Sequence, residues 1–493
     1  MTSDPEKEAS DDPAVQSFGG RARSGTAWIV LAFGLGQVLR LGANVVLAAL
    51  LFEEAFALMA IVSAVMMGLA MFSDIGLQTN VVQHPRGDEP DFLNTAWTLQ
   101  VIRGICLFSV ALILAWPLAQ IYGANDPKAY ELLYLIPIVA LTSLIDGFKS
   151  AKLMTAARHL NIKEVIQIDF IAGIFNALVI VGLAWYLRSV YALAIAAVLS
   201  TALSASLSYW MLNGPRSQLR WEAEAIRAII SFGKWIFIST VITFLALQID
   251  RLALAGTFPL AEVGVYAIAA SLAAIIPALV GKVQGSVLFA WYSRMLQQGM
   301  PLPVAFARTH MAALVLSSYL CALLVSGASS FFALAYDDRY SMGGVLLPML
   351  AIGAWFSCLE TMYGAAFIAS GRSKWVAITS AVKVGSYALM LIPLFLFKLD
   401  IATAAMFFAA SEVVRIFCCQ YLGRTLGLRN ARVEGGMLTF FLIVSLTGWW
   451  MAAHAPFVSE IKPFWRLAVL GLFTTGLFLP LFLRFVIPLI RPR

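Results

Sequence analysis

Long apolar segments recur along almost the whole chain, and they constrain its fold more than any other feature. A helix needs about 20 apolar residues to cross the hydrocarbon core of a bilayer. Hydrophobic residues make up 61% of the 493 residues and charged residues 12%, against about a quarter charged in soluble domains. We therefore expect an all-α polytopic membrane protein. About fourteen spans are predicted, at 26–51, 54–79, 95–119, 131–151, 165–187, 189–212, 230–257, 263–290, 304–327, 343–369, 375–397, 400–421, 436–454 and 464–487.

The Lys and Arg residues near the span ends indicate orientation, because basic residues collect on the cytoplasmic side of a membrane protein. With the N-terminus inside, nineteen of them fall on the cytoplasmic side and six on the outer side. Both termini are thus predicted to be cytoplasmic. Residues 1–25 are polar and lack a basic start and a cleavage site, so we expect a disordered tail rather than a signal peptide.

Several function classes lack the motifs that they need. The formal net charge is +7, but no nucleic-acid motif or basic soluble domain accompanies it, so we expect no nucleic-acid partner. The five cysteines lie in apolar runs without metal-ligand spacing, which predicts no metal site. The sequence also lacks GxxxxGK[ST], HExxH and GxSxG, and its hydrophilic insertions are short. We expect no enzymatic activity and no cofactor, with the function carried out among the helices.

The two halves of the chain show a weak internal repeat. At an offset of 207 residues, FALMAIVSA (56–64) falls on VGVYAIAAS (263–271), and Asn44 falls on Arg251. Both copies begin on the same side, as in parallel repeats related by an axis along the membrane normal. We therefore predict six-helix bundles at 26–224 and 225–435 around a central cleft. Residues 436–493 are predicted to add two further transmembrane helices.

Charged residues inside predicted spans need an explanation, because each costs about 2.5 to 3.5 kcal/mol at the centre of a lipid-exposed helix. Local pairing explains some of them. Asp146 and Lys149 lie three residues apart, as do Glu412 and Arg415, so each pair can neutralise itself on one helix face. Asp74 and Asp169 lie close to the cytoplasmic ends of their spans, where long or capping side chains reach water.

Six other charged residues are the candidates for a functional site. Four bases on four different helices would form a basic chamber for an anion if they face one cleft. Two acids would offset that charge or carry a coupling ion. The alternative for all six is buried ion pairing between helices. The candidate substrate-binding bases are Arg40, Arg251, Lys282 and Lys383, and the candidate cavity or coupling acids are Asp250 and Glu360.

The stretch LALQIDRLALAG (245–256) places two of these candidates side by side. Neighbouring residues on a helix point about 100° apart. Asp250 and Arg251 therefore need separate partners. We expect Arg251 to face the cleft, because Asn44 occupies its place in the other half.

Two stretches carry a family resemblance. FSDIGLQTNVVQHPRGDEPDFLNTAWTLQ (72–100) resembles the segment after the second span of Wzx-type oligosaccharide flippases and polysaccharide transporters, and residues 231–294 resemble their seventh and eighth spans. These proteins belong to the multidrug/oligosaccharidyl-lipid/polysaccharide exporter superfamily. The resemblance implies two six-helix bundles with two further helices, and alternating access.

The resemblance also implies a substrate and a cellular location. The substrate would be an oligosaccharide on a polyprenyl pyrophosphate, moved across the bacterial inner membrane for surface polysaccharide assembly, with membrane lipid, a polymerase and export machinery as partners. Arg40, Arg251, Lys282 and Lys383 would then bind pyrophosphate or sugar. Three alternatives stay open. A drug or cation antiporter of the same superfamily predicts an acidic cavity, and an integral membrane glycosyltransferase or ligase predicts a long outer loop with catalytic acids. The third is a scaffolding subunit of a polysaccharide machine, which no sequence feature distinguishes.

Overall fold

A computed structural model describes residues 34–74, 77–159, 162–214, 217–283 and 288–487. The predicted tail, residues 1–25, lies outside the described residues. Within them the chain is helical and contains no strand, which confirms the all-α prediction. Twelve helices are long and apolar enough to cross a membrane. The chain is therefore a multi-pass membrane protein.

The helices coincide with the predicted spans. The first is described over residues 34–50 and is apolar. The others are α3 (Glu53–Phe72), α5 (Pro90–Gly123), α6 (Leu132–Gly147), α8 (Ile162–Leu187), α9 (Tyr191–Trp210), α10 (Ala223–Ala255), α11 (Leu260–Val283), α13 (Leu302–Ala335), α14 (Gly343–Ala369), α15 (Lys374–Leu396), α16 (Ile401–Arg424), α17 (Ala431–His454) and α19 (Pro463–Leu481).

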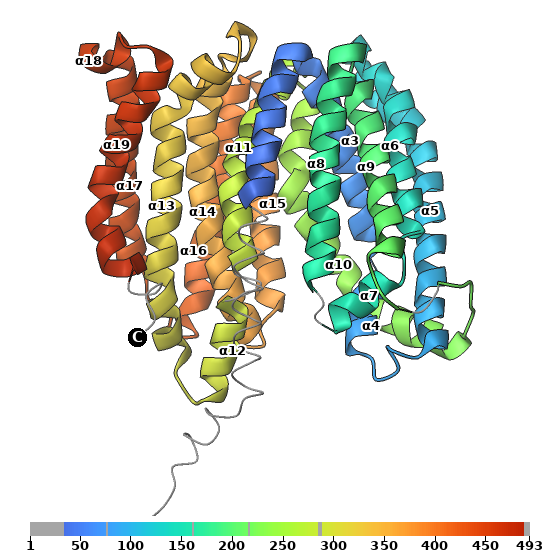
Figure 1. Cartoon of the computed structure of the whole chain (residues 1–493). Helices are drawn as coiled ribbons and strands as arrows, with labels where there is room; N and C mark the ends of the chain where they lie inside the picture. Colours follow the sequence, from blue (N-terminus) through green and yellow to red (C-terminus); the bar gives the residue numbers. More distant parts are fainter. Residues whose placement is uncertain (1–33, 75–76, 160–161, 215–216, 284–287, 488–493) are drawn as a thin grey trace, which may run out of the picture.

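Short helices that the span prediction missed lie at one end of the molecule, which we call the α12 end. They are α4 (Leu77–Gln83), α7 (Lys152–Arg158) and α12 (Phe289–Gln297), and α18 (Pro456–Ser459) marks the opposite α18 end (Figure 1). The second span consequently ends earlier than predicted, at Phe72, and α11 is described up to Val283. Apolar residues of α4 lengthen the predicted second span, since composition alone does not reveal where the chain turns.

Helix α5 is longer than α3 and α6 and contacts an end of each. Its 34 residues span about 50 Å. Within it, Arg103 donates from Nη2 to the Ala70 carbonyl at the end of α3 (2.7 Å), and Gln100 donates from Nε2 to the Asp146 carbonyl at the end of α6 (3.0 Å). The last carbonyls of a helix have no partner within it. Polar residues inside α5 therefore satisfy two neighbouring helix ends.

Helices from the two halves of the chain pack mainly with their own neighbours. α5 packs on α6 and α8 on α9, while α14 packs on α11, α13 and α16. α17 and α19 lie against α13 at one edge of the molecule (Figure 1). α3 packs on α10 and α11 and so joins the group of α5, α6, α8 and α9 to the group of α11, α13, α14 and α16. In Figure 1 the ribbons of these two groups diverge toward the α12 end.

Candidate functional site

A cavity of about 390 Å³ lies between the helix over residues 34–50, α8 and Lys282 of α11. We call it the first cavity. It joins the two halves of the chain, because Lys282 belongs to the second half and the other lining residues to the first. Its polar lining residues are Gln37, Arg40, Asn44, Asp169, Asn176 and Lys282.

Helical spacing places these polar groups on common faces. Gln37, Arg40 and Asn44 follow one another at three and four residues, so they share one face of the first helix. Asp169 and Asn176 are two turns apart on α8, with Gly173 between them. A Cβ at Gly173 would meet nothing within 4 Å. Its missing side chain therefore leaves room in the cavity rather than permitting a close helix contact.

The first cavity is positively charged on balance. Arg40 has no hydrogen-bond or ion-pair partner among the described residues and is exposed to the cavity. Lys282 and Asp169 attract each other electrostatically. Two bases against one acid leave a formal charge of +1, and guanidinium and ammonium groups are the side chains that bind phosphates in proteins. The arrangement is thus suited to an anion.

Asp250 and Arg251 take separate partners, as the helix geometry requires, and neither lines the first cavity. Asp250 is buried, and its Oδ2 accepts a hydrogen bond from the Tyr266 hydroxyl of α11 (2.8 Å). Its Oδ1 has no hydrogen-bond partner in the described part of the chain. Arg251 is half-buried and donates from Nη1 to Oε1 of Gln248 on its own helix (3.4 Å).

Lys383 and Glu360 belong to a buried ion cluster of α14, α15 and α16. Lys383 Nζ lies 2.6 Å from Glu412 Oε1, and Arg415 Nη2 lies 2.9 Å from Glu360 Oε1. Arg415 also contacts Glu412 at 3.6 Å, so the predicted i, i+3 pair is confirmed. Two acids and two bases balance formally. We name these four residues the α14–α16 ion cluster, and they do not line the first cavity.

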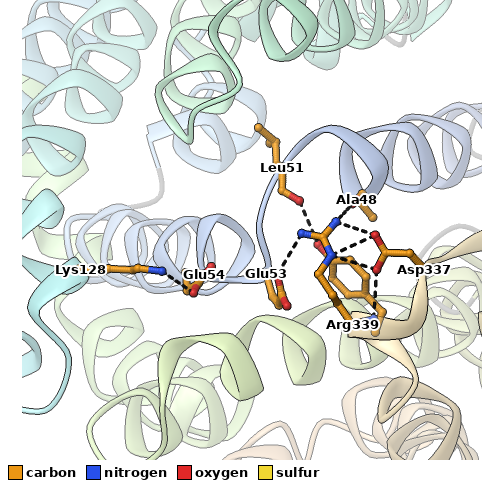
Figure 2. A network of polar contacts seen from close by, with 8 residues as sticks. Ala48, Leu51, Glu53, Glu54, Lys128, Asp337 and Arg339 are labelled. Carbon is orange, nitrogen blue, oxygen red and sulfur yellow. Dashed lines mark hydrogen bonds and ion pairs between the residues drawn. The ribbon is translucent and has the colours of Figure 1, made fainter.

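A network of contacts at the α18 end joins the two halves (Figure 2). Arg339, in the turn between α13 and α14, contacts Glu53 Oε2 (3.5 Å) and donates to the Ala48 carbonyl (3.4 Å). The Tyr340 hydroxyl donates to the Leu51 carbonyl (3.4 Å). Arg339 is oriented by Asp337, whose Oδ2 lies 2.5 Å from Nη2. Within the first half, Lys128 pairs with Glu54 at 2.6 Å.

Further contacts at the same end use backbone acceptors. The Tyr122 hydroxyl donates to the Leu252 carbonyl (3.3 Å), and the Asn125 amide donates to the Gly256 carbonyl. A Cβ at Gly264 would lie 1.9 Å from the Glu53 carbonyl oxygen, so α11 approaches α3 as closely as only glycine allows. Together with the Arg339 contacts, these residues form what we call the α18-end closure.

Some residues of the cavity escaped the sequence analysis. Sequence position places Asp169 near a helix end, and Gln37 and Asn176 carry no charge that would single them out. The two polar residues at positions 169 and 176, two turns apart on an otherwise apolar helix, are the signal that would have found them. The Asp146–Lys149 pair, in contrast, forms as predicted, at 2.8 Å.

A family model described as "Polysaccharide biosynthesis protein" matches residues 46–343, more than half of the chain. The chain belongs to the polysaccharide biosynthesis protein family. The match contains α3 to α13 and all residues of the α18-end closure. The resemblance predicted from residues 72–100 and 231–294 is thereby confirmed. No curated protein sequence matches the chain significantly.

Solved structures share the fold of this family member at low sequence identity. A structure described as the lipid II flippase MurJ in an inward closed conformation has a TM-score of 0.74 at 11% identity, covering 94% of this chain and 100% of that one. An inward-facing MATE multidrug transporter of the MOP superfamily gives 0.62 at 13% identity, covering 80% and 94%. The eukaryotic MATE transporter AtDTX14 gives 0.57 at 14% identity, covering 85% and 98%. These likenesses establish the fold.

Proposed function

We propose that the protein is a flippase that moves a polyprenyl-pyrophosphate-linked oligosaccharide, a precursor of surface polysaccharide, across the bacterial inner membrane. The single observation that carries the proposal is the first cavity, where Arg40 and Lys282 from opposite halves of the chain face one space. A pyrophosphate is an anion that such a pair can hold. Family membership supports the substrate class.

The transport mechanism that we propose is alternating access. Two bundles, 26–224 and 225–435, rock about the first cavity, with 436–493 as two additional helices. The α18-end closure holds the two halves together at one end, while the first cavity reaches toward the α12 end. We place the α12 end and both termini in the cytoplasm, because the predicted cytoplasmic loops are the basic ones. The lipid-linked substrate then enters from inside, and polymerase and export proteins act on it outside.

The candidate residues divide between direct and indirect roles in this proposal. Arg40 and Lys282 bind the pyrophosphate. Arg251 and Lys383 hold neighbouring groups in this conformation, through Gln248 and Glu412 respectively. Asp250, buried with one unpartnered carboxylate oxygen, is the acid that we propose for ion coupling, whereas Glu360 is already paired with Arg415.

A cation antiporter of the MATE type shares the fold but needs an acidic cavity. The first cavity has two bases and one acid. An anionic substrate therefore fits its charge better, since an organic cation would be repelled by Arg40 and Lys282 together.

The experiment replaces Arg40 or Lys282 with Ala in cells that depend on this protein for surface polysaccharide. We expect lipid-linked oligosaccharide to accumulate on the cytoplasmic leaflet, with partial rescue by Arg40→Lys because one cation is kept. Lys462→Gln, which removes an exposed cation at the α18 end, is the matched control. Normal polymer output from Arg40→Ala and Lys282→Ala together would remove the first cavity from the mechanism.

A further inference from the structure

A second cavity of about 400 Å³ lies within the first half of the chain, between α3, α5, α6 and α7. The proposed function leaves it unused. Apolar residues such as Leu107 and Met154 line part of its wall. Its polar lining residues are Asp74, Gln100, Arg103, Ser143, Asp146 and Lys149.

Arg103 is fixed in this cavity but keeps one donor group for a ligand. Its Nε donates to Ser73 Oγ (2.9 Å) and its Nη2 to the Ala70 carbonyl (2.7 Å). Its Nη1 has no hydrogen-bond partner among the described residues. A guanidinium held in this way presents its remaining donors without losing side-chain freedom on binding.

Asp146 and Lys149 stand beside Arg103 as an accessible pair. They contact each other at 2.8 Å, with 51% and 26% of their side chains exposed. With Asp74 and Arg103 they make two acids and two bases, so the second cavity is formally neutral, unlike the first. It offers both acceptors and donors, which suits hydroxyl groups, because a hydroxyl both donates and accepts hydrogen bonds.

The two cavities are neighbours. Helix α8 lines the first cavity and α7 lines the second, and α7 packs on α8. One ligand with an anionic group and an adjoining polar chain can therefore occupy both.

We propose that the second cavity binds the sugar residues next to the pyrophosphate of the transported lipid. The proposal rests on the proposed function and deepens it, since it assigns recognition of the glycan to Arg103, Asp146 and Lys149. The first cavity supplies attraction for the charged group. The second supplies hydrogen bonds that discriminate sugars, in the way that a few placed polar groups confer specificity in a largely apolar pocket.

Binding to the purified protein in lipid nanodiscs tests the assignment with two probes, farnesyl pyrophosphate and farnesyl pyrophosphate carrying one hexose. The double variant Asp146→Ala with Lys149→Ala removes two polar side chains and leaves the net charge unchanged. We expect it to weaken binding of the hexose-bearing probe about tenfold and that of farnesyl pyrophosphate less than about twofold. Asp91→Ala with Arg220→Ala, an exposed ion pair outside both cavities, is the matched control and should change neither affinity.

Four results would contradict one or other part of the proposal. Unchanged affinity for the hexose-bearing probe in the double variant overturns the sugar subsite. Equal weakening of both probes also overturns it, because the pair would then act on the pyrophosphate site. Loss of a co-purifying phospholipid with unchanged hexose affinity would make the cavity a lipid headgroup site instead. If neither probe binds the unmodified protein, the proposed function itself fails.

Discussion

Arg339 of the second half lies 3.5 Å from Glu53 of the first, across the α18 end of the molecule (Figure 2). Both side chains are partly accessible, at 36% and 14% exposure. Such a pair contributes about 0 to 1 kcal/mol. It therefore favours the closed state by a small free energy, which agrees with the proposed alternating access, in which this end opens in every cycle.

Arg339→Gln should loosen the α18-end closure. Loss of the contacts to Glu53 and the Ala48 carbonyl lowers the free energy gap between closed and open states by up to about 1 kcal/mol, a change of up to about fivefold in the open population. The measurement is thiol labelling of Ala48→Cys, a position 1% exposed here, in a chain whose native cysteines have been replaced. Lys462→Gln removes a cation at the same end and should leave labelling unchanged. Slower labelling in Arg339→Gln would contradict the closure.

Gly264→Ala should disturb the same end more strongly. The new Cβ would lie 1.9 Å from the Glu53 carbonyl oxygen, so α11 and α3 have to separate. Overpacking of this kind costs about 1 to 3 kcal/mol. We expect faster labelling of Ala48→Cys than in Arg339→Gln. Gly471→Ala, where a Cβ meets nothing within 4 Å, is the control, and equal labelling of the two glycine variants would show that the contact between α3 and α11 does not control closure.

Acid should weaken the closure only at low pH. A hydrogen bond from Arg339 holds the pKa of Asp337, in the turn outside the spans, below its ordinary value of 3.8. A carboxyl with a lowered folded-state pKa contributes stability above its ordinary pKa and loses it as pH falls through the lowered value. Labelling of Ala48→Cys should thus be independent of pH between about pH 6 and about pH 8, because Asp337 stays ionised throughout that range. Below pH 3.8 it should increase, and Asp337→Asn should show the acid behaviour already at neutral pH. A neutral-pH labelling rate unaffected by Asp337→Asn would argue against this role.

Substitution of Lys383 tests whether the α14–α16 ion cluster stabilises the fold or binds substrate. Lys383→Met leaves Glu412 buried without its 2.6 Å partner, and removing one member of a buried pair costs about 3 to 5 kcal/mol. Glu412→Gln in addition restores charge balance, so most of this loss in unfolding free energy should be recovered. Chemical unfolding in detergent measures both. If the double variant is stable but no longer transports substrate, Lys383 is a substrate-binding residue rather than a structural one.

The positions of the spans could be predicted because each helix has to meet the same length and hydropathy requirement. Local charge pairs could be predicted for a related reason, as Asp146 and Lys149 share a helix face by spacing alone. Pairs between helices could not. Glu412 lies 29 residues from Lys383, and only packing of α15 on α16 brings them together.

Only part of the candidate site could be predicted, because contacts between helices depend on packing. Arg40 and Lys282 share a cavity, and Asp250 accepts a hydrogen bond from Tyr266 on α11. The sequence pattern, however, is the same for a cation that faces a cleft and for one that faces a carboxylate. The neutral members of the first cavity needed the structure, since amide side chains in spans carry too small a penalty to stand out.

Backbone carbonyls accept most of the contacts that close the α18 end: those of Ala48, Leu51, Leu252 and Gly256. A carbonyl is the same in every amino acid. Related sequences are therefore free to vary at these four acceptor positions, while selection falls on the donors Tyr122, Asn125, Arg339 and Tyr340. Sequence comparison therefore detects only the donor side chains of these contacts and not the carbonyl acceptors. A relative that keeps only the donors is expected to keep the closure.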